Sequence, residues 1–141
     1  MGIINLSSGG SVPARVASQS QVCEECPECI INSLSSDLYP ATLTISSSGE
    51  ANRLYPELMG DYNKIPGKFR NGRPVWKHTY SNAEFNYDYI YEDNYWLVKS
   101  DTVKISSEDS LLEQIPVRRW LFYDYTLSRW IMDETMIVQG W

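Results

Sequence analysis

The chain has 141 residues, 43% of them hydrophobic, which is enough for one domain with its own core. Its formal net charge of -6 argues against nucleic acids and anionic membrane surfaces as partners, since both attract a basic face. No apolar run approaches the roughly 20 residues that span a bilayer, so membrane insertion is not expected. The first residues also lack the charged start of a signal peptide, so the chain is either not secreted or a mature piece.

The N-terminal quarter differs in composition from the rest. Residues 1–22 are rich in Ser, Gly, Ala and Val and show neither a helical nor a strand period. This composition is typical of a mobile arm or of a segment that a neighbour orders. We therefore predict a flexible or docking N-terminal arm over residues 1–37 and an aromatic-rich antiparallel β domain over residues 38–141.

All three cysteines, Cys23, Cys26 and Cys29, lie within seven residues of the arm. A zinc site would need the distant His78 as its fourth ligand, and an iron–sulfur cluster would need a fourth cysteine. The glutamates between the cysteines also disfavour thiolates. Inert thiols are a further alternative and need a reducing compartment. We favour disulfides or a linkage to another chain, because an odd number leaves one cysteine for a partner.

Short alternating segments follow the arm. Period-two alternation predicts the first secure strand at residues 41–47. Residues 54–59 are ambiguous and allow one helical turn around Pro56. A strand resumes at residues 61–65 and is expected to break at residues 66–67, a Pro-Gly pair.

The clearest local signal is the pair Asn71-Gly72, which favours positive φ at both positions of a two-residue hairpin turn. In the strand after this turn, Trp76, His78 and Tyr80 share one face. His78 is therefore expected to lie half-buried in an aromatic stack.

Two more hairpins are predicted. Tyr87, Tyr89 and Tyr91 alternate with other residues and predict a row of rings on one face of a strand. A turn at residues 92–94 leads to a return strand over residues 95–99, with cross-strand aromatic pairs.

The last third continues in the same manner. A short strand is expected over residues 101–107 and a helical turn over residues 111–113. Residues 118–124 and 127–133 form a third hairpin, and residues 135–139 form the last strand. Together these segments predict an all-β fold, either a small antiparallel sandwich or a partly open barrel, with an extended N-terminal arm.

Nothing in the chain carries a recognisable catalytic motif. His78 is the only histidine, and no nucleophile elbow, phosphate loop or dinucleotide fingerprint occurs. Acidic residues are plentiful on the predicted turns, which leaves a glycosidase-like pair and a calcium site as alternatives that no spacing selects. We predict no enzyme activity, no catalytic residue, no metal and no cofactor.

The 10 Tyr and 5 Trp residues allow two interpretations. Rings on strands form either a platform on which sugars stack or the core of a small β fold. We assign Trp96, Trp120 and Trp130 to the core, because their neighbours are aliphatic. The predicted binding surface consists of Trp76, Tyr80, Tyr87, Tyr89, Tyr91 and Tyr125.

Residues 60–132 carry a pattern of Gly-x-Tyr, Asn-Gly-Arg-Pro-Val-aromatic, a Tyr-rich strand, a Trp-aliphatic return and a final Trp hairpin. This pattern resembles a small tryptophan-rich module that recurs in extracellular and surface proteins of protists and marine invertebrates. The resemblance implies no enzyme activity and no defined ligand. It implies repetition in surface or secreted assemblies.

These expectations lead to one preferred function and one alternative. The preferred function is a structural module of an extracellular or cell-surface assembly. Its partners would be further copies or other surface proteins, bound through the arm, the strand edges and the cysteines. The alternative is a carbohydrate-binding module that uses the exposed rings to bind a glycan.

Overall fold

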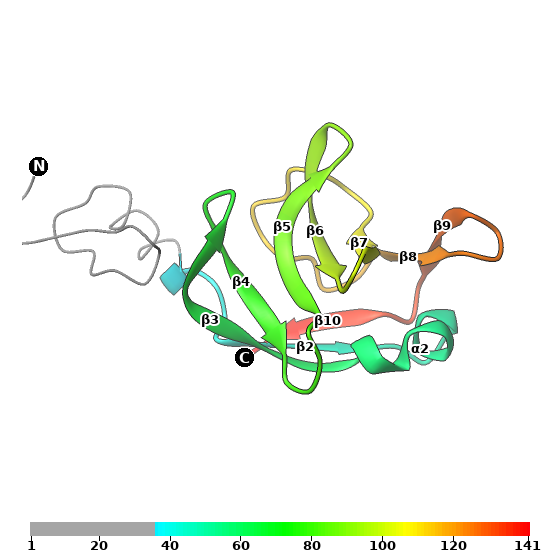
Figure 1. Ribbon diagram of the computed structural model, residues 1–141, viewed down its shortest axis with the longest axis horizontal. Coiled ribbons are helices and arrows are strands. Elements are labelled where there is room, and N and C mark those ends of the chain that lie inside the picture. The colour runs from blue at the N-terminus through cyan, green and yellow to red at the C-terminus, as the bar shows by residue number, and fades with distance from the viewer. Residues whose placement is uncertain (1–35) are drawn as a thin grey trace, which may run out of the picture. The chain divides into compact units, whose positions relative to one another are not determined.

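The computed structural model describes residues 36–141, and their fold is all-β, as predicted (Figure 1). Among these residues nine antiparallel strands form one sheet in the order β10-β2-β3-β4-β5-β6-β7-β8-β9. The strands are β2 (Thr42–Ser46), β3 (Gly60–Arg70), β4 (Arg73–His78), β5 (Glu84–Ile90), β6 (Asp93–Lys99), β7 (Val103–Ser107), β8 (Trp120–Asp124), β9 (Arg129–Asp133) and β10 (Ile137–Gly140). Two short helices, α2 (Glu50–Leu54) and η1 (Pro56–Leu58), connect β2 to β3.

The described residues divide into two compact units: a smaller one, which contains Ile65–Pro74 at the tip of the β3–β4 hairpin and the residues up to Tyr39, and a larger one, which comprises Pro40–Lys64 and Val75–Trp141. Within the tip, the predicted two-residue turn is confirmed: Asn71 has φ 52° and Gly72 has φ 79°. Both positions lie in the left-handed region that Asn and Gly tolerate best. The expected break at residues 66–67 is wrong, because β3 continues through them while Gly67 adopts φ 74°.

The larger unit holds the functional candidates. Its sheet curls, and its two edge strands are β9 and β10. β10 pairs with β2 in register from Ile137 opposite Ser46 to Gly140 opposite Leu43, so the last strand lies beside the first described one. In residues 36–141 no helix is long and apolar enough to cross a membrane.

The predicted helical turn over residues 111–113 is wrong, because this segment makes its hydrogen bonds to distant parts of the chain. The Leu111 amide donates to the Asn94 carbonyl at 2.8 Å, and Leu111 itself has φ 60°, which a helix excludes. The Leu112 carbonyl accepts the indole N–H of Trp96 at 3.0 Å. Hydrogen bonds to distant residues, and not the local helix preference, therefore determine the conformation of residues 111–113.

The core of the larger unit is built from aromatic rings around Phe85. The Phe85 ring stacks on Trp96 with centroids 5.8 Å apart and meets the edge of Trp76 at 5.7 Å. Trp120 lies 5.8 Å from the same ring. Phe85 and all three tryptophans have 0% exposure. Each Trp buries about 150–250 Å², so these rings provide much of the apolar burial.

The three buried tryptophans also fix the loops that surround them. Each indole N–H donates to a backbone carbonyl outside the strands at 3.0 Å, from Trp76 to Pro40, from Trp96 to Leu112 and from Trp120 to Pro116. A buried indole N–H without an acceptor would cost about 1–3 kcal/mol. The rings therefore hold the chain ahead of β2 and the long β7–β8 connection in place.

We expect the substitution Trp120→Phe to lower the free energy of unfolding by about 2–4 kcal/mol, because it removes a hydrogen bond and leaves a cavity. Trp141→Phe is the matched control. Trp141 also donates its indole N–H, to Thr44 at 2.8 Å, but it is 71% exposed, so its loss should cost less than about 1 kcal/mol. Urea unfolding followed by fluorescence measures both changes. Equal costs for the two variants would contradict the role of the buried rings.

Candidate functional site

Two of the six rings predicted to form a binding surface are in the core. Trp76 is 0% exposed and Tyr87 is 4% exposed, so neither belongs to an exposed platform. Tyr87 faces Trp96 across the β5–β6 pair, with ring centroids 4.9 Å apart. The assignment of Trp96 and Trp120 to the core is confirmed, since both are 0% exposed, whereas Trp130, which was assigned there too, is only half-buried on β9.

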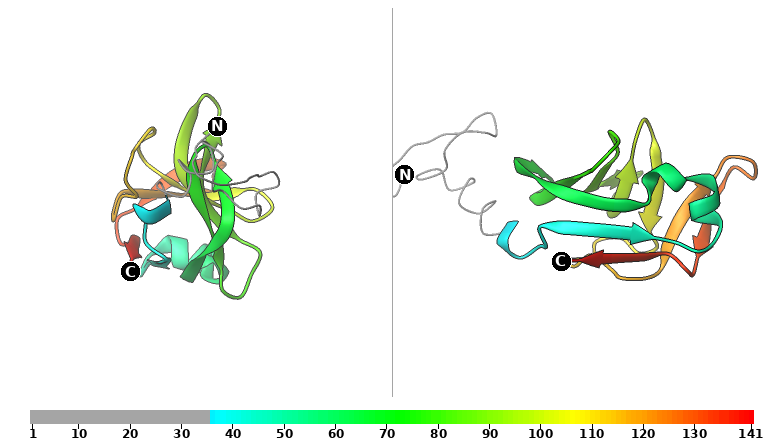
Figure 2. Two further views of the ribbon diagram at one scale, coloured as in Figure 1. Left: turned by 90° about the vertical axis from the view of Figure 1, so that its left-hand side faces the viewer. Right: turned by 90° about the horizontal axis from the view of Figure 1, so that it is seen from below.

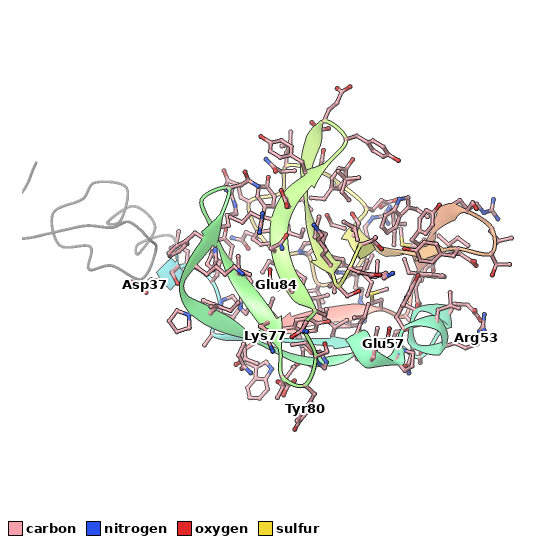
Figure 3. All side chains as sticks on the ribbon, in the orientation of Figure 1. Asp37, Arg53, Glu57, Lys77, Tyr80 and Glu84 are labelled. Carbon is pink, nitrogen blue, oxygen red and sulfur yellow. The ribbon has the colours of Figure 1, made fainter. Side chains whose placement is uncertain are left out.

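The other four predicted rings are exposed, but they do not form one surface. Tyr80 is 91% exposed and points away from the sheet after β4 (Figure 3). Tyr91 is 93% exposed and has φ 60° in the β5–β6 turn, not in the strand, so the predicted row of three rings is wrong. Tyr89, at 59% exposure, lies on β5, and Tyr125, at 54%, lies in the β8–β9 loop.

His78 packs against aromatic rings, as predicted, but it is buried (6% exposed) and not half-buried, and both of its ring nitrogens are hydrogen-bonded. Nε2 lies 2.8 Å from the Met59 carbonyl, and Nδ1 accepts the Tyr80 amide at 3.1 Å. This pattern requires the proton on Nε2. The imidazole meets the edge of Tyr62 at 4.9 Å. His78 therefore joins the β3 and β4 segments and has no nitrogen left to act as a base.

The structure brings together a group of side chains that the sequence analysis missed, around Lys104 on β7. Its ammonium lies 3.2 Å from the Tyr125 hydroxyl and 3.2 Å from Asp101. It also lies over the Tyr125 ring at 4.8 Å and over the Tyr55 ring at 5.9 Å. We call Tyr55, Asp101, Lys104 and Tyr125 the Lys104 cluster. Only 14% of the Lys104 side chain is exposed, so this cation is held among the rings.

Hydrogen bonds in the Lys104 cluster change the acidity of its members. A hydrogen bond between the Thr102 and Tyr125 hydroxyls, at 2.8 Å, and one that Lys104 donates to Tyr125 lower the pKa of the Tyr125 phenol. Burial opposes the charge of Lys104, but its bonds to Tyr125 and Asp101 outweigh this and raise its pKa. At neutral pH the Lys104 ammonium therefore stays charged, and its charge makes the Tyr125 phenol more acidic.

The Lys104 cluster continues into the β8–β9 hairpin. The Tyr55 hydroxyl donates to the Tyr123 carbonyl at 2.6 Å, which attaches the end of α2 to β8. The Tyr123 ring lies 4.7 Å from Tyr125 and 5.3 Å from Trp130, in edge-to-face contacts. Edge-to-face ring contacts and a largely covered cation thus hold one face of this hairpin against the unit.

β9 is an open edge of the sheet. It pairs only with β8, and in residues 36–141 no further backbone hydrogen bond reaches the outer side of Arg129 to Met132. Its central residues Trp130, Ile131 and Met132 are half-buried. The hairpin lies at the end of the sheet, with its loop extending beyond the neighbouring strands (orange in Figure 1 and in the right view of Figure 2). Unpaired backbone groups beside apolar side chains are the usual template for strand addition.

Asp133, the last residue of β9, is a buried carboxylate with 5% exposure. It accepts four hydrogen bonds, from the Ser47 hydroxyl and the Thr135 hydroxyl at 2.6 Å, the Thr135 amide at 2.9 Å and the Ala51 amide at 3.0 Å. Burial opposes its ionisation, but these bonds outweigh burial and hold its pKa below the ordinary value. A Cβ at Gly49 would lie 2.9 Å from Asp133 Oδ1, so the site also requires that glycine. Asp133 thereby fixes the end of β9 to the start of α2.

The remaining predictions concern other parts of the molecule. Cys23, Cys26 and Cys29 lie outside the described residues, as does nearly all of the predicted arm. Within residues 36–141 no group of three His, Cys, Asp or Glu side chains is placed to hold a metal ion.

No protein-family model, curated protein or solved structure matches this chain significantly. The resemblance to the tryptophan-rich surface module therefore stays a prediction.

Titration tests the Lys104 cluster. In absorbance at 295 nm, Tyr125→Phe should remove the phenol that ionises first, since its pKa is lowered. Lys104→Met should move that ionisation to higher pH, because the phenolate loses a cation and a donor. Tyr62→Phe, which removes a phenol whose pKa burial raises, is the control and should leave the early phase intact. An unchanged early phase in Lys104→Met would refute the assignment.

Stability against pH tests Asp133. Its folded pKa lies below the ordinary 3.8, so its contribution is complete above that value and is lost as the pH falls through the folded pKa. Asp133→Asn should lower the free energy of unfolding by about 2–4 kcal/mol at pH 7. The difference in the free energy of unfolding between the wild type and Asp133→Asn should shrink below about pH 4. A difference that stays constant from pH 7 to pH 3 in urea unfolding would show that the charge is unimportant.

Proposed function

We propose that this protein is a non-catalytic interaction module of an extracellular or cell-surface assembly, and that it associates through the open edge of β9. The observation that carries the proposal is an edge strand with unpaired backbone groups and three half-buried apolar side chains. An incoming extended strand would satisfy those backbone groups and cover those side chains.

The two edges of the sheet differ in a way that supports this choice. At β10, the Val138 amide donates to the Val117 carbonyl at 2.9 Å, so the long β7–β8 connection already covers the middle of that edge. β9 has no such cover among the described residues. Of the two edges, β9 is therefore the one available to a partner.

The β9 edge is also rigid, which favours binding. The rings of Tyr123 and Trp130 and the four hydrogen bonds of Asp133 hold it at both ends. A strand that is already ordered loses little conformational freedom when a partner pairs with it. The arm and its cysteines would add a second connection between subunits, in line with the expectation from the sequence.

Substitutions on the edge test the proposal. Sedimentation of the whole chain in reductant should show association that depends on concentration. Trp130→Lys should weaken it at least about 10-fold, because a charge replaces apolar contact at the edge. Tyr91→Lys, which changes an exposed ring of the β5–β6 turn, is the control and should associate normally. A wild-type protein that is monomeric at all concentrations, with and without reductant, contradicts the proposal.

The alternative function, glycan binding, has one specific observation in its favour. The 54% exposed ring of Tyr125 lies beside the hydroxyl of Thr102, the ammonium of Lys104 and the carboxylate of Asp101. A sugar that stacks on this ring would meet both donors and acceptors. A glycan array decides the matter: binding that Tyr125→Ala abolishes and Tyr91→Ala leaves intact would favour a carbohydrate module over an assembly module.

A further inference from the structure

We propose that the partner of β9 is β9 of a second copy, paired antiparallel about a two-fold axis that passes through Ile131. This inference rests on the proposed function and specifies its partner. An isologous contact of this kind requires that one strand be complementary to its own reverse. The charges and side chains of β9 meet this requirement.

The register follows from the position of the axis. With Ile131 opposite Ile131 of the second copy, Trp130 lies opposite Met132 and Arg129 lies opposite Asp133. Residue numbers in each opposed pair then add up to 262, as 130 with 132 and 129 with 133 do. Trp130 and Met132 both pair with residues of β8 on the same face, Tyr123 and Leu121.

Neither charged residue at the ends of β9 makes a salt bridge within residues 36–141, although Asp124 of β8 lies directly opposite Arg129 in the strand pairing. Arg129 is exposed. Asp133 is a buried carboxylate with four hydrogen bonds but no Lys or Arg partner among the same residues. The two-fold pairing brings each Arg129 opposite Asp133 of the other copy. Opposite charges in directly opposed cross-strand positions are favourable, and here the contact occurs twice.

The apolar residues fit the same register. Trp130 and Met132 are both half-buried, so each leaves part of its side chain for a partner to cover. A methionine sulfur against an aromatic ring is a favourable contact, and this one also occurs twice. A shift of two residues in one direction would place Arg129 opposite Ile131, and in the other direction opposite Thr135. Either shift loses both the charge pairs and the Trp130–Met132 contacts.

The surroundings of β9 leave room for the second hairpin. Met132 and Glu134 line an open pocket of about 460 Å³ together with Glu108, Arg118 and Arg119. The register places Ser128 of the second copy opposite Glu134, so its β8–β9 loop would lie at the rim of this pocket. Leu127 in that loop is 52% exposed and is available for contact there.

Disulfide trapping tests the register. In a full chain whose three native cysteines are replaced by serine, Ile131→Cys should give a covalent dimer under mild oxidation, because directly opposed residues place their Cβ atoms about 4.5–5.5 Å apart. Arg129→Cys is the control. The two copies of residue 129 would be about 13 Å apart, four residues along the strand, so this variant should stay monomeric on reducing-agent-free gels.

A mixing experiment gives the same information without a change at Ile131. Trp130→Cys and Met132→Cys, each in the cysteine-free chain, should form little disulfide alone and a mixed dimer when combined. Arg129→Glu should weaken association by about 10-fold or more, whereas Arg129→Lys should keep most of it.

The outcomes separate the two proposals. If the protein associates and Trp130→Lys weakens it, but Ile131→Cys fails to cross-link and the mixture gives no mixed dimer, the two-fold pairing is wrong and the open edge takes another partner strand. If the cysteine-free chain associates only while residues 1–35 are present, the arm is that strand. A chain that is monomeric throughout overturns both the pairing and the proposed function.

Discussion

The structure depends on the packing of buried tryptophans around Phe85. Three indoles surround this ring, and each uses its N–H to hold a loop carbonyl at 3.0 Å. The same side chains therefore supply apolar burial and fix the connections that cannot bond within the sheet. Because the long β7–β8 connection is held in this way, it can cover the β10 edge through Val117.

Because the β7–β8 connection covers β10, β9 is the edge through which we propose that the protein associates. A curled sheet that does not close has two edges, and here tertiary packing protects one of them. The Lys104 cluster and Asp133 then hold the unprotected strand at its two ends. Asp133 is a buried carboxylate, a costly arrangement unless it is fully hydrogen-bonded, as it is here. This cost is consistent with a strand whose position is fixed before a partner binds.

Sequence reasoning succeeded where the cause is local. Asn71-Gly72 determines its own turn, because positive φ at two successive positions is a property of those residues. Strand alternation likewise located most strands. It did not show which face of a strand would be covered, so Trp76 and Tyr87 were assigned to a surface and lie in the core. The predicted helical turn over residues 111–113 was wrong for a related reason, because this segment forms hydrogen bonds with Asn94 and Trp96, which are distant in the sequence.

The Lys104 cluster had no sequence signal at all, because Tyr55, Lys104 and Tyr125 come from three distant segments. The sequence also does not show that β9 is an open edge strand, because this depends on the order of the strands in the sheet.

Hydrogen exchange of the backbone amides at several protein concentrations tests most directly whether the protein associates through the β9 edge. Association through this edge predicts that the amides of Trp130 to Met132 that point away from β8 become protected as concentration rises, while the Val138 amide does not change. Exchange in β9 that is independent of concentration, in a protein that nevertheless associates, would contradict the account.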